Sequence, residues 1–232
     1  MKLKNETLSK NFLIYGFGKS GISSLKYLKK KNRCFIFDDD KKKIKNKYKK
    51  FFISKSKLLK NNFDYIVISP GININRCQLS NYLKKNQKKV ITDFDIFYKF
   101  NPEVLTITIT GTNGKSTTSK LLYDILKKHN YDTRLTGNIG NPILEEKRVT
   151  KNTIFVIEAS SYQLAYSKYF KSKFSIIINI SPDHLERHNT MKNYVLSKLK
   201  CVIRQNENDV AIITNTNSVS YTHLTLPTRR GV

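Results

Sequence analysis

Short apolar segments recur along this chain, and lysine-rich segments with helical spacing lie between them. Continuous apolar strands that alternate with helices are typical of parallel sheets covered by helices on both faces. The pattern therefore predicts an α/β fold, and it restricts the possible topologies more than any other property of the sequence. The expected strands are 11–15, 33–37, 63–69, 104–110, 153–157, 174–180 and 210–214.

These segments form two series, which predict two domains. We expect a Rossmann-like parallel-sheet domain over residues 1–98 and a P-loop-type α/β domain over residues 99–217, with a hinge at Asn101-Pro102. Residues 218–232 follow neither series, because the chain has no lysine from Cys201 onward and its last residues lack periodicity. We interpret them as a disordered native tail or as an artefact of sequence assembly.

The strand 104–110 leads into Thr110-Gly-Thr-Asn-Gly-Lys-Ser-Thr117, and a helical pattern follows over 118–130. This order of strand, glycine loop and helix holds nucleotide phosphates, because backbone N–H groups and a helix N-terminus favour anions. In such a loop Lys115 reaches the terminal phosphates and the Ser116 hydroxyl is a ligand of Mg²⁺. The residues expected to bind the phosphates are Gly111, Thr112, Asn113, Gly114, Lys115, Ser116 and Thr117.

One residue departs from the general phosphate-loop motif. That motif has a glycine five residues before Gly114, where this chain has Ile109, so only Gly111 is available and the loop is shortened. A bare Gly-Lys-Ser also starts ordinary helices. The strand before the loop and the helix after it favour phosphate binding over that alternative.

A second glycine motif, Gly16-Phe-Gly-Lys-Ser-Gly21, matches G-x-G-x-x-G in full between a strand and a helix. Asp38 ends the next strand, 20 residues after Gly18, where an acid contacts a ribose hydroxyl in dinucleotide-binding proteins. The motif predicts a site for a nucleotide or a nucleotide sugar, without separating NAD from the others; the alternative is a tight strand–helix turn. Ser69-Pro-Gly-Ile72 follows the third strand where open α/β sheets bind ligands, although alone it is typical of a turn.

Polar residues also end two strands of the second series. Glu158 directly follows four apolar residues, and its carboxylate suits Mg²⁺ as an oxygen ligand, directly or through water. Asp183-His184 follows the strand 174–180. Because the carboxyl ends of parallel strands meet at one edge, we expect the phosphate loop, Glu158 and His184 to converge. Taken alone, His184 is typical of an ordinary loop histidine.

Lys198 falls inside the apolar stripe of a helix expected near 190–203, four residues after Tyr194 and four before Val202. A lysine on a buried face must reach solvent with its amine, pair with an anion or lose its charge. Two interpretations therefore stay open for Lys198: an amine that reaches the surface, or an amine with a lowered pKa that takes part in chemistry.

The formal net charge of +26 suggests a nucleic-acid-binding protein at first sight. Lys outnumbers Arg 35 to 8, however, whereas bidentate contacts with phosphate and guanine favour Arg. The lysines are spread along the chain without a repeated pattern of aromatic residues for stacking. We therefore expect a solvated lysine surface and no nucleic-acid partner.

The three cysteines, Cys34, Cys77 and Cys201, lie far apart and form no Cys-x-x-Cys pair, so they predict neither a disulfide framework nor a zinc site. No segment approaches the ~18 apolar residues that span a membrane. The first apolar segment is also too short for the core of a signal peptide. We expect a cytoplasmic protein without a membrane partner.

Taken together, the motifs resemble those of the Mur ligases of peptidoglycan synthesis, and the shortened phosphate loop is also the form found in that family. The resemblance covers residues from about 10 to 215, in family order and spacing. Glu158-Ala-Ser-Ser-Tyr-Gln-Leu164 with Gly137-Asn-Ile-Gly140 points to the member that adds D-glutamate. The other matching segments are 16–21, 69–72, 110–117, 183–187 and Lys198.

The resemblance implies an ATP-dependent amide ligase that adds D-glutamate to UDP-N-acetylmuramoyl-L-alanine. The substrate carboxylate attacks the γ-phosphate of ATP, and the amine of D-glutamate displaces phosphate from the acyl phosphate. The first domain would bind the UDP part and the second would bind ATP, in a chain that acts as a monomer. The implied substrate-binding residues are Gly16, Gly18, Ser20, Gly21, Asp38, Ser69, Asn138 and Ser160.

The resemblance also implies two Mg²⁺ ions. Ser116 and Glu158 resemble ligands of one ion, and His184 and Lys198 resemble ligands of the other. In the family this lysine is carbamylated, which turns a cation into an oxygen ligand and accounts for a lysine inside an apolar stripe. The catalytic residues implied in this way are Lys115, His184 and Lys198.

Mur ligases continue well beyond the matching region, with a domain that holds much of the amino-acid site. We therefore expect an incomplete central domain, a tail over 218–232 outside the family, and a fragment that is inactive alone. Three alternatives remain: a related amide ligase such as folylpolyglutamate synthase, a nucleotide-binding regulatory module without catalysis, and an NAD-dependent oxidoreductase. Tyr162-Gln163-Leu164 argues against the first, Lys198 argues against the second, and the third rests on the first glycine motif only.

Overall fold

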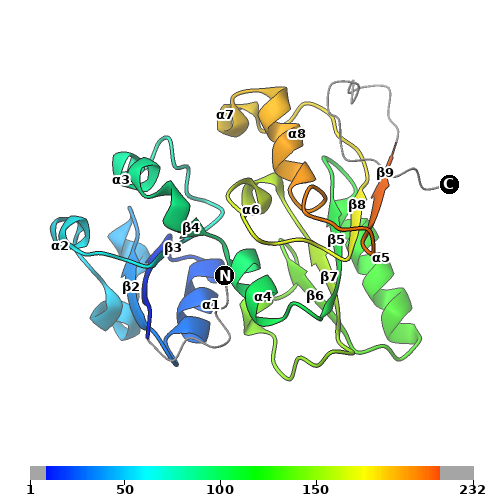
Figure 1. The fold of residues 1–232 in the computed structure, drawn as a ribbon, viewed down its shortest axis with the longest axis horizontal. Helices are drawn as coiled ribbons and strands as arrows, with labels where there is room; N and C mark the ends of the chain where they lie inside the picture. The colour runs from blue at the N-terminus through cyan, green and yellow to red at the C-terminus, as the bar shows by residue number, and fades with distance from the viewer. Residues whose placement is uncertain (1–8, 215–232) are drawn as a thin grey trace. The chain divides into compact units, whose positions relative to one another are not determined.

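The computed structural model describes residues 9–214, so the tail expected over 218–232 lies outside the described residues. The chain divides into two compact units (Figure 1). The first unit runs to Phe100 and also includes the short segments Pro142–Glu145 and Tyr166–Lys168. The second unit contains the remaining residues from Asn101 onward.

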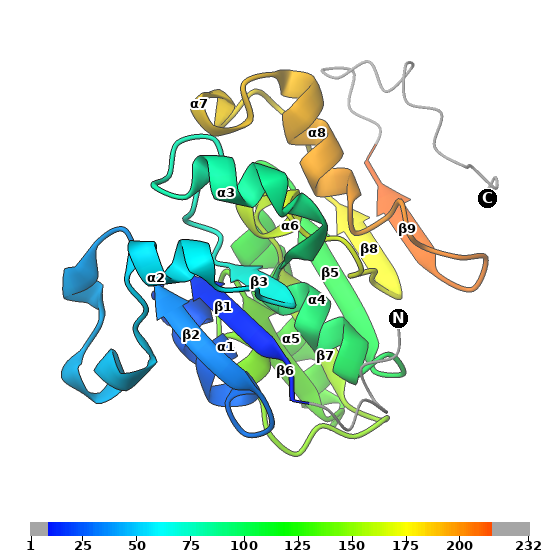
Figure 2. The ribbon, with the colours of Figure 1, turned by 60° about the vertical axis from the view of Figure 1, so that its left-hand side comes forward.

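A parallel sheet with the strand order β2-β1-β3-β4 forms the centre of the first unit. Its strands are β1 (Asn11–Tyr15), β2 (Arg33–Phe37), β3 (Tyr65–Ile68) and β4 (Val90–Ile91). The helices are α1 (Lys19–Leu28), α2 (Lys55–Lys60), α3 (Ser80–Lys85) and α4 (Asp93–Phe100), with 3₁₀ turns η1 (Lys41–Lys43), η2 (Asn46–Phe51), η3 (Gln87–Lys89) and η4 (Ile143–Glu145). Right-handed crossovers put α1 on one face of the sheet and α2 and α3 on the other (Figure 2).

The strand β1 lies at the centre of the first core because both of its faces are covered. Phe12, Leu13, Ile14 and Tyr15 are each at most 1% exposed. Each such side chain stabilises the fold by roughly 1.5–3 kcal/mol through the apolar area that it buries. Burial on both faces is why this strand has an unbroken apolar sequence instead of an alternating one.

The second unit is built on another parallel sheet, with the strand order β6-β7-β5-β8-β9. Its strands are β5 (Leu105–Thr110), β6 (Thr133–Gly137), β7 (Ile154–Glu158), β8 (Phe174–Ile177) and β9 (Val210–Ile213). Its helices are α5 (Lys115–Lys128), α6 (Ser161–Ala165), α7 (Leu185–His188) and α8 (Met191–Leu199). α5 packs on one face, against β5, β6 and β7, whereas α6 and α8 pack together on the other face (Figure 1).

The α/β class and all seven expected strands are confirmed, with differences of a few residues at their ends. The sequence did not predict β4 and β6. β4 has two residues, and β6 reads Thr-Arg-Leu-Thr-Gly, which is polar because this strand lies at the edge of its sheet. α5 begins three residues earlier than the helical pattern indicated, because the Lys-Ser-Thr of the glycine motif already forms its first turn. Within residues 9–214, no helix has the length and apolar character needed to cross a membrane.

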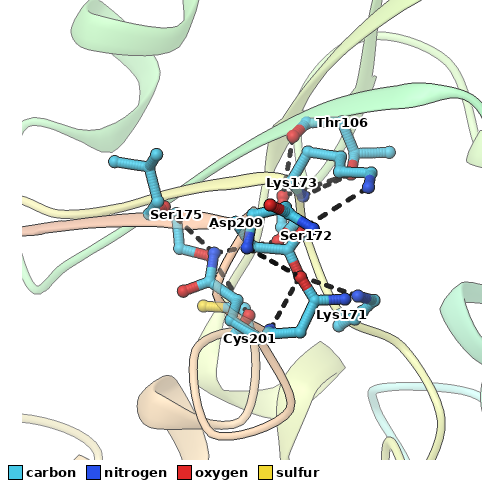
Figure 3. A network of polar contacts seen from close by, with 11 residues as sticks. Thr106, Lys171, Ser172, Lys173, Ser175, Cys201 and Asp209 are labelled. Atoms are coloured by element: carbon cyan, nitrogen blue, oxygen red, sulfur yellow. Dashed lines mark hydrogen bonds and ion pairs between the residues drawn. The ribbon is translucent and has the colours of Figure 1, made fainter. Parts of the chain in front are cut away.

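Asp209 fixes the start of β9, an edge strand whose own residues are largely exposed (Figure 3). Its carboxylate accepts hydrogen bonds from the Lys171 amine at 2.7 Å and from the backbone N–H of Asn206 at 2.9 Å. The Lys173 amine lies 3.4 Å from the second oxygen, and the Asp209 side chain is 0% exposed. The cost of burying this carboxylate is therefore offset by two cations and one N–H group.

We expect Asp209→Ala to lower the free energy of unfolding of the second unit by about 2 kcal/mol, because it leaves two cations without their shared anion. Burial opposes ionisation of Asp209, but the bonds from Lys171 and Asn206 more than offset it, so its pKa is lowered. The stabilisation is therefore present above the unfolded pKa and is lost as the pH falls through the folded pKa. Urea unfolding followed by circular dichroism measures both effects.

Asp124→Ala is the matched control for Asp209→Ala. Asp124 pairs with Lys120 one turn away on α5, and both side chains are more than half exposed. Such a pair contributes roughly 0.3–0.5 kcal/mol. Equal losses of stability in the two variants would contradict the role assigned to Asp209.

Candidate functional site

The expected substrate pocket lies at the carboxyl end of the first sheet, where the strand order reverses around β1. The residues after β1, β2 and β3 together line a hollow of about 270 Å³. Ligands of open α/β sheets bind at this type of position. The expected residues that line it are Gly16, Gly18, Ser20, Asp38 and Ser69.

Gly21 lies just behind this pocket, where α1 packs closely against the turn after β1. A Cβ atom at Gly21 would lie 2.1 Å from the carbonyl oxygen of Gly16, which is too close for any real contact. The Ser69 hydroxyl donates to the same oxygen at 2.6 Å, so the turn is held from two sides. At Gly18, by contrast, a Cβ atom would meet nothing within 4 Å, and this open space admits a ligand to the backbone.

Asp38 holds the turn of the glycine motif onto the end of β2. Its side chain is buried and accepts backbone N–H groups from Phe17 at 2.6 Å and from Asp40 at 2.9 Å. A carboxylate has about four acceptor positions, so two remain for a ligand hydroxyl. Asp38 therefore shapes the pocket wall, and this role is compatible with the contact expected from the sequence.

The second sheet repeats this arrangement, since β5 lies between β7 and β8 and the phosphate loop (Thr110–Thr117) follows it. Gly114 adopts a left-handed φ of 80° and caps α5. The N–H groups in the first turn of a helix have no partner within that helix, and Ser116 and Thr117 are exposed there. The Lys115 amine donates to the Thr112 carbonyl at 2.7 Å, so its charge lies at the loop.

Lys198 is buried, with 2% of its surface exposed. The interpretation in which its amine reaches the surface is therefore wrong. Its Nζ donates to the Gly111 carbonyl of the phosphate loop at 2.6 Å and lies 4.6 Å from the centre of the Tyr194 ring. Burial, followed by repulsion from Lys115, lowers the pKa of Lys198 from 10.5 to about 7, although Asp183 opposes this change. A large share of the amine is therefore uncharged near neutral pH, whereas an ordinary lysine is almost fully charged.

Glu158 is the last residue of β7 and is 0% exposed. It pairs with Ile109 in the neighbouring strand, two residues before Gly111, so it lies at the same edge as the phosphate loop. Its Oε1 accepts a hydrogen bond from the Asn138 side chain at 2.7 Å. Its Oε2 is buried without a hydrogen-bond partner among the described residues, and such an orphaned oxygen needs a cation or a donor.

His184 has a positive φ of 52°, which is uncommon for a residue with a side chain and is often found at functional sites. Its Nε2 lies 3.3 Å from Asp183, and its ring packs on Tyr162 with 4.8 Å between ring centres. The Tyr194 ring is 6.5 Å from His184, and Tyr194 also contacts Lys198. The two residues expected to share a metal ion are thus joined through one aromatic side chain.

Ser160 and Gln163 form a capping box at the start of α6. The Ser160 hydroxyl donates to the Gln163 side-chain oxygen at 3.0 Å and accepts the backbone N–H of Gln163 at 3.2 Å. Asn138 is similarly engaged with Glu158. Both residues expected to contact substrate therefore also have local partners, which the family motif alone did not indicate.

The donors at this edge are suited to Mg²⁺, which prefers hard oxygen ligands. Glu158 offers a buried carboxylate oxygen that has no hydrogen-bond partner within residues 9–214, and Ser116 offers an exposed hydroxyl at the start of α5. In the part of the chain that the structure describes, no group of three or more His, Cys, Asp or Glu side chains is arranged so that it could hold a metal ion. An ion here would therefore take its other ligands from phosphate oxygens and water.

Two residues that hold the phosphate loop were missed as polar contacts. Asn179, just beyond β8, bonds to Thr112 and Asn113, and Tyr194 donates to or accepts from the Thr112 hydroxyl at 3.0 Å. An asparagine within the apolar run 174–180 was the only signal for the first. Tyr194 was expected only as part of the apolar stripe. Its ring does pack in the apolar core, but its hydroxyl contacts the loop.

The Mur ligase middle domain family matches residues 109–230, which is just over half of the chain. The chain is 35% identical over 229 residues to the UDP-N-acetylmuramoylalanine–D-glutamate ligase of Caldicellulosiruptor bescii, covering 91% of this chain and 48% of that protein. It is 32% identical over 215 residues to the ligase of the same name from Clostridioides difficile, covering 88% of this chain and 48% of that protein.

The fold also resembles a solved structure, the UDP-N-acetylmuramate:L-alanyl-gamma-D-glutamyl-meso-diaminopimelate ligase from Neisseria meningitides. The TM-score is 0.58 at 13% identity, over 91% of this chain and 73% of that one, so the likeness concerns the fold alone. The chain spans about half the length of the curated relatives it matches. On the family match, supported by both glycine motifs at their sheet edges, this chain belongs to the Mur ligase family.

Proposed function

We propose that this chain provides the ATP site and the UDP-substrate site of a ligase that joins D-glutamate to UDP-N-acetylmuramoyl-L-alanine. The names of its relatives from C. bescii and C. difficile support this choice of substrates. The observation that carries the proposal is the buried Lys198 amine, 2.6 Å from the phosphate loop. An uncharged lysine in this position serves chemistry at a phosphate, whereas a module that only binds nucleotide has no use for it.

The proposed reaction has two steps. The carboxylate of UDP-N-acetylmuramoyl-L-alanine attacks the γ-phosphorus of ATP, which forms an acyl phosphate and releases ADP. The amine of D-glutamate then attacks the acyl carbon, which forms the amide and releases phosphate. Catalysis of phosphoryl transfer depends mainly on positioning and on neutralising charge. The N–H groups at the start of α5 and the Lys115 ammonium group would supply both.

In this proposal Ser116 and Glu158 hold one Mg²⁺ ion, and His184 and Lys198 hold a second. Bound Mg²⁺ would neutralise negative charge on the phosphates. Lys198 would first be carbamylated, because only an uncharged amine adds CO₂ and its pKa of about 7 makes that form abundant. The resulting carbamate supplies an oxygen ligand for Mg²⁺, which the lysine ammonium group cannot do.

The first unit would bind the UDP part of the substrate in the hollow after β1. The open space at Gly18 and the start of α1 suit a diphosphate. Asn138 and Ser160 are proposed to contact the substrate in addition to their local partners.

The proposed location of the chain is the reducing cytoplasm, because the reaction needs ATP and the three cysteines form no disulfide. We propose that the chain acts there as a monomer.

Isothermal titration of the 232-residue chain with UDP-N-acetylmuramoyl-L-alanine, ADP and NAD tests the proposal. Gly21→Ala is expected to abolish binding of the UDP compound, because its Cβ would collide with the Gly16 carbonyl, and to leave ADP binding intact. Lys115→Met is expected to lower the affinity for ADP about tenfold, because it removes a charged hydrogen-bond donor. The affinity for the UDP compound should not change. Each variant is thus the control for the other.

The outcomes separate the alternatives. NAD binding without binding of the UDP compound would replace the proposal with an oxidoreductase. Binding of both proposed ligands together with a solvent-reactive, charged Lys198 would favour a regulatory module.

A further inference from the structure

The shortened phosphate loop raises the question of what holds its shape. The glycine that begins the general motif is replaced by Ile109, which is buried in β5. Gly111 instead packs directly against the chain that follows β8, since a Cβ atom there would lie 3.3 Å from both the backbone N and O of Asn179. The N–H of Ile178 donates to the Thr110 carbonyl at 3.0 Å in the same region. The loop therefore lies against the residues that directly follow β8.

The Asn179 side chain completes this contact. Its Oδ1 accepts the backbone N–H of Asn113 at 2.9 Å. It also shares the backbone N–H of Thr112 with the Asn179 backbone carbonyl, each at 3.0 Å. Its Nδ2 donates to the Asn113 carbonyl at 3.1 Å. These bonds fix which end of the amide is oxygen, because two N–H groups need an acceptor. One side chain thus fixes two consecutive peptide groups of the loop.

This arrangement divides the N–H groups of the loop into two sets. Those of Thr112 and Asn113 are already bonded to Asn179. Those of Lys115, Ser116 and Thr117 begin a helix of 14 residues and have no partner within it. An anion at the loop would therefore be bound by the N–H groups of residues 115–117. The bonds at residues 112 and 113 determine the direction in which those N–H groups point.

We propose that Asn179 is a positioning residue of the nucleotide site: it fixes residues 112 and 113 so that the N–H groups at the start of α5 converge on the phosphates. The inference rests on the proposed function, since it assumes that the loop binds a nucleotide. The Asn179 side chain spends its oxygen and one of its two Nδ2 hydrogens on the loop, so the role assigned to it here is to position the loop. In effect, it replaces the missing first glycine of the motif.

The test compares Asn179→Ala with the wild-type chain in the affinity for ADP, for inorganic pyrophosphate and for UDP-N-acetylmuramoyl-L-alanine. We expect ADP and pyrophosphate to bind about tenfold more weakly, which corresponds to the loss of one or two hydrogen bonds that orient the loop. The UDP compound should bind as in wild type, because it occupies the first unit. Asn206→Ala is the matched control, since its side chain accepts one backbone N–H in a turn far along the chain from the loop.

Amide hydrogen exchange supplies a second measurement that a loss of stability alone would not reproduce. The N–H of Asn113 should exchange faster in Asn179→Ala, relative to the amides of β5, and should regain protection in Asn179→Asp, which keeps the acceptor oxygen. Unchanged ADP affinity in Asn179→Ala would overturn the inference, as would an equal increase in exchange throughout β5. A wild-type chain that does not bind ADP would instead contradict the proposed function, and the inference with it.

Discussion

Lys198→Met is expected to stabilise the second unit by about 1–4 kcal/mol at pH 7, although it removes a residue that the proposed chemistry requires. Lys198 is 2% exposed, and among residues 9–214 its Nζ has a single backbone carbonyl as hydrogen-bond acceptor. Methionine has a similar length and no charge to desolvate. Urea unfolding of both chains at pH 7 measures the gain, with Lys192→Met as control, because Lys192 is exposed on the same helix.

The stability of the wild-type chain should also depend on pH through Lys198. The folded pKa of Lys198 is lowered from 10.5 to about 7, chiefly by burial, so between these pH values the unfolded chain binds a proton that the folded chain lacks. Stability should therefore rise with pH in that window, by up to about 1.4 kcal/mol per pH unit for one proton. This part of the slope should vanish in Lys198→Met and persist in Lys192→Met. Identical pH profiles for all three chains would show that Lys198 is not buried as a neutral amine.

The same variant tests carbamylation. In ¹³C-labelled bicarbonate, the wild-type chain and Lys192→Met should show a carbamate resonance by NMR, and Lys198→Met should not. A carbamate that persists in Lys198→Met would place the modification on another lysine. A wild-type chain without any carbamate resonance would leave Lys198 as an unmodified amine and contradict its proposed role as a metal ligand.

Glu158→Gln is expected to remove the effect of Mg²⁺ on nucleotide binding. The substitution keeps an oxygen for the Asn138 side chain. It removes the negative charge from the buried Oε2, which has no hydrogen-bond partner in the described part of the chain. Removing a partner of a metal ligand costs about 10–100-fold in metal affinity, so we expect about 100-fold for a ligand itself. The measurement is the affinity for ADP with and without Mg²⁺.

Without Mg²⁺, the Glu158→Gln variant should bind ADP at least as well as wild type, because a negative charge has been taken away from the phosphates. Glu103→Gln serves as control, since Glu103 is exposed and lies before β5. If Mg²⁺ raised the affinity for ADP equally in wild type and in Glu158→Gln, Glu158 would not be a ligand of Mg²⁺. Its orphaned oxygen would then require another explanation.

Much of the fold could be predicted because buried parallel strands have unbroken apolar sequences. β1 and β7 are examples, and their boundaries in the structure lie within one residue of the expected ones. β6 was missed because an edge strand needs no such sequence, and Leu135 is its only strongly apolar residue. The burial of Lys198 was foreseen as one of two possibilities, from its place in a helical stripe.

The contacts of the site could not be predicted to the same degree. The sequence indicates that the phosphate loop and Lys198 belong to one site, but it does not reveal that the amine bonds to the Gly111 carbonyl. Nor does it distinguish an asparagine that bonds to Glu158 from one that bonds to the loop, because Asn138 and Asn179 have the same chemistry. Only the folded arrangement shows that Asn138 faces Glu158 and that Asn179 faces the loop.

The contacts between α8 and the phosphate loop also order events during synthesis. Lys198 follows Gly111 by 87 residues, and Tyr194 follows Thr112 by 82. A ribosome therefore releases the complete loop sequence long before the helix that holds it, and contacts between such distant residues form late. A nascent chain that stops before α8 carries every residue of the motif and Asn179, but it lacks the bonds from Tyr194 and Lys198. The contacts between the loop and α8 are thus completed only once Lys198 has been made.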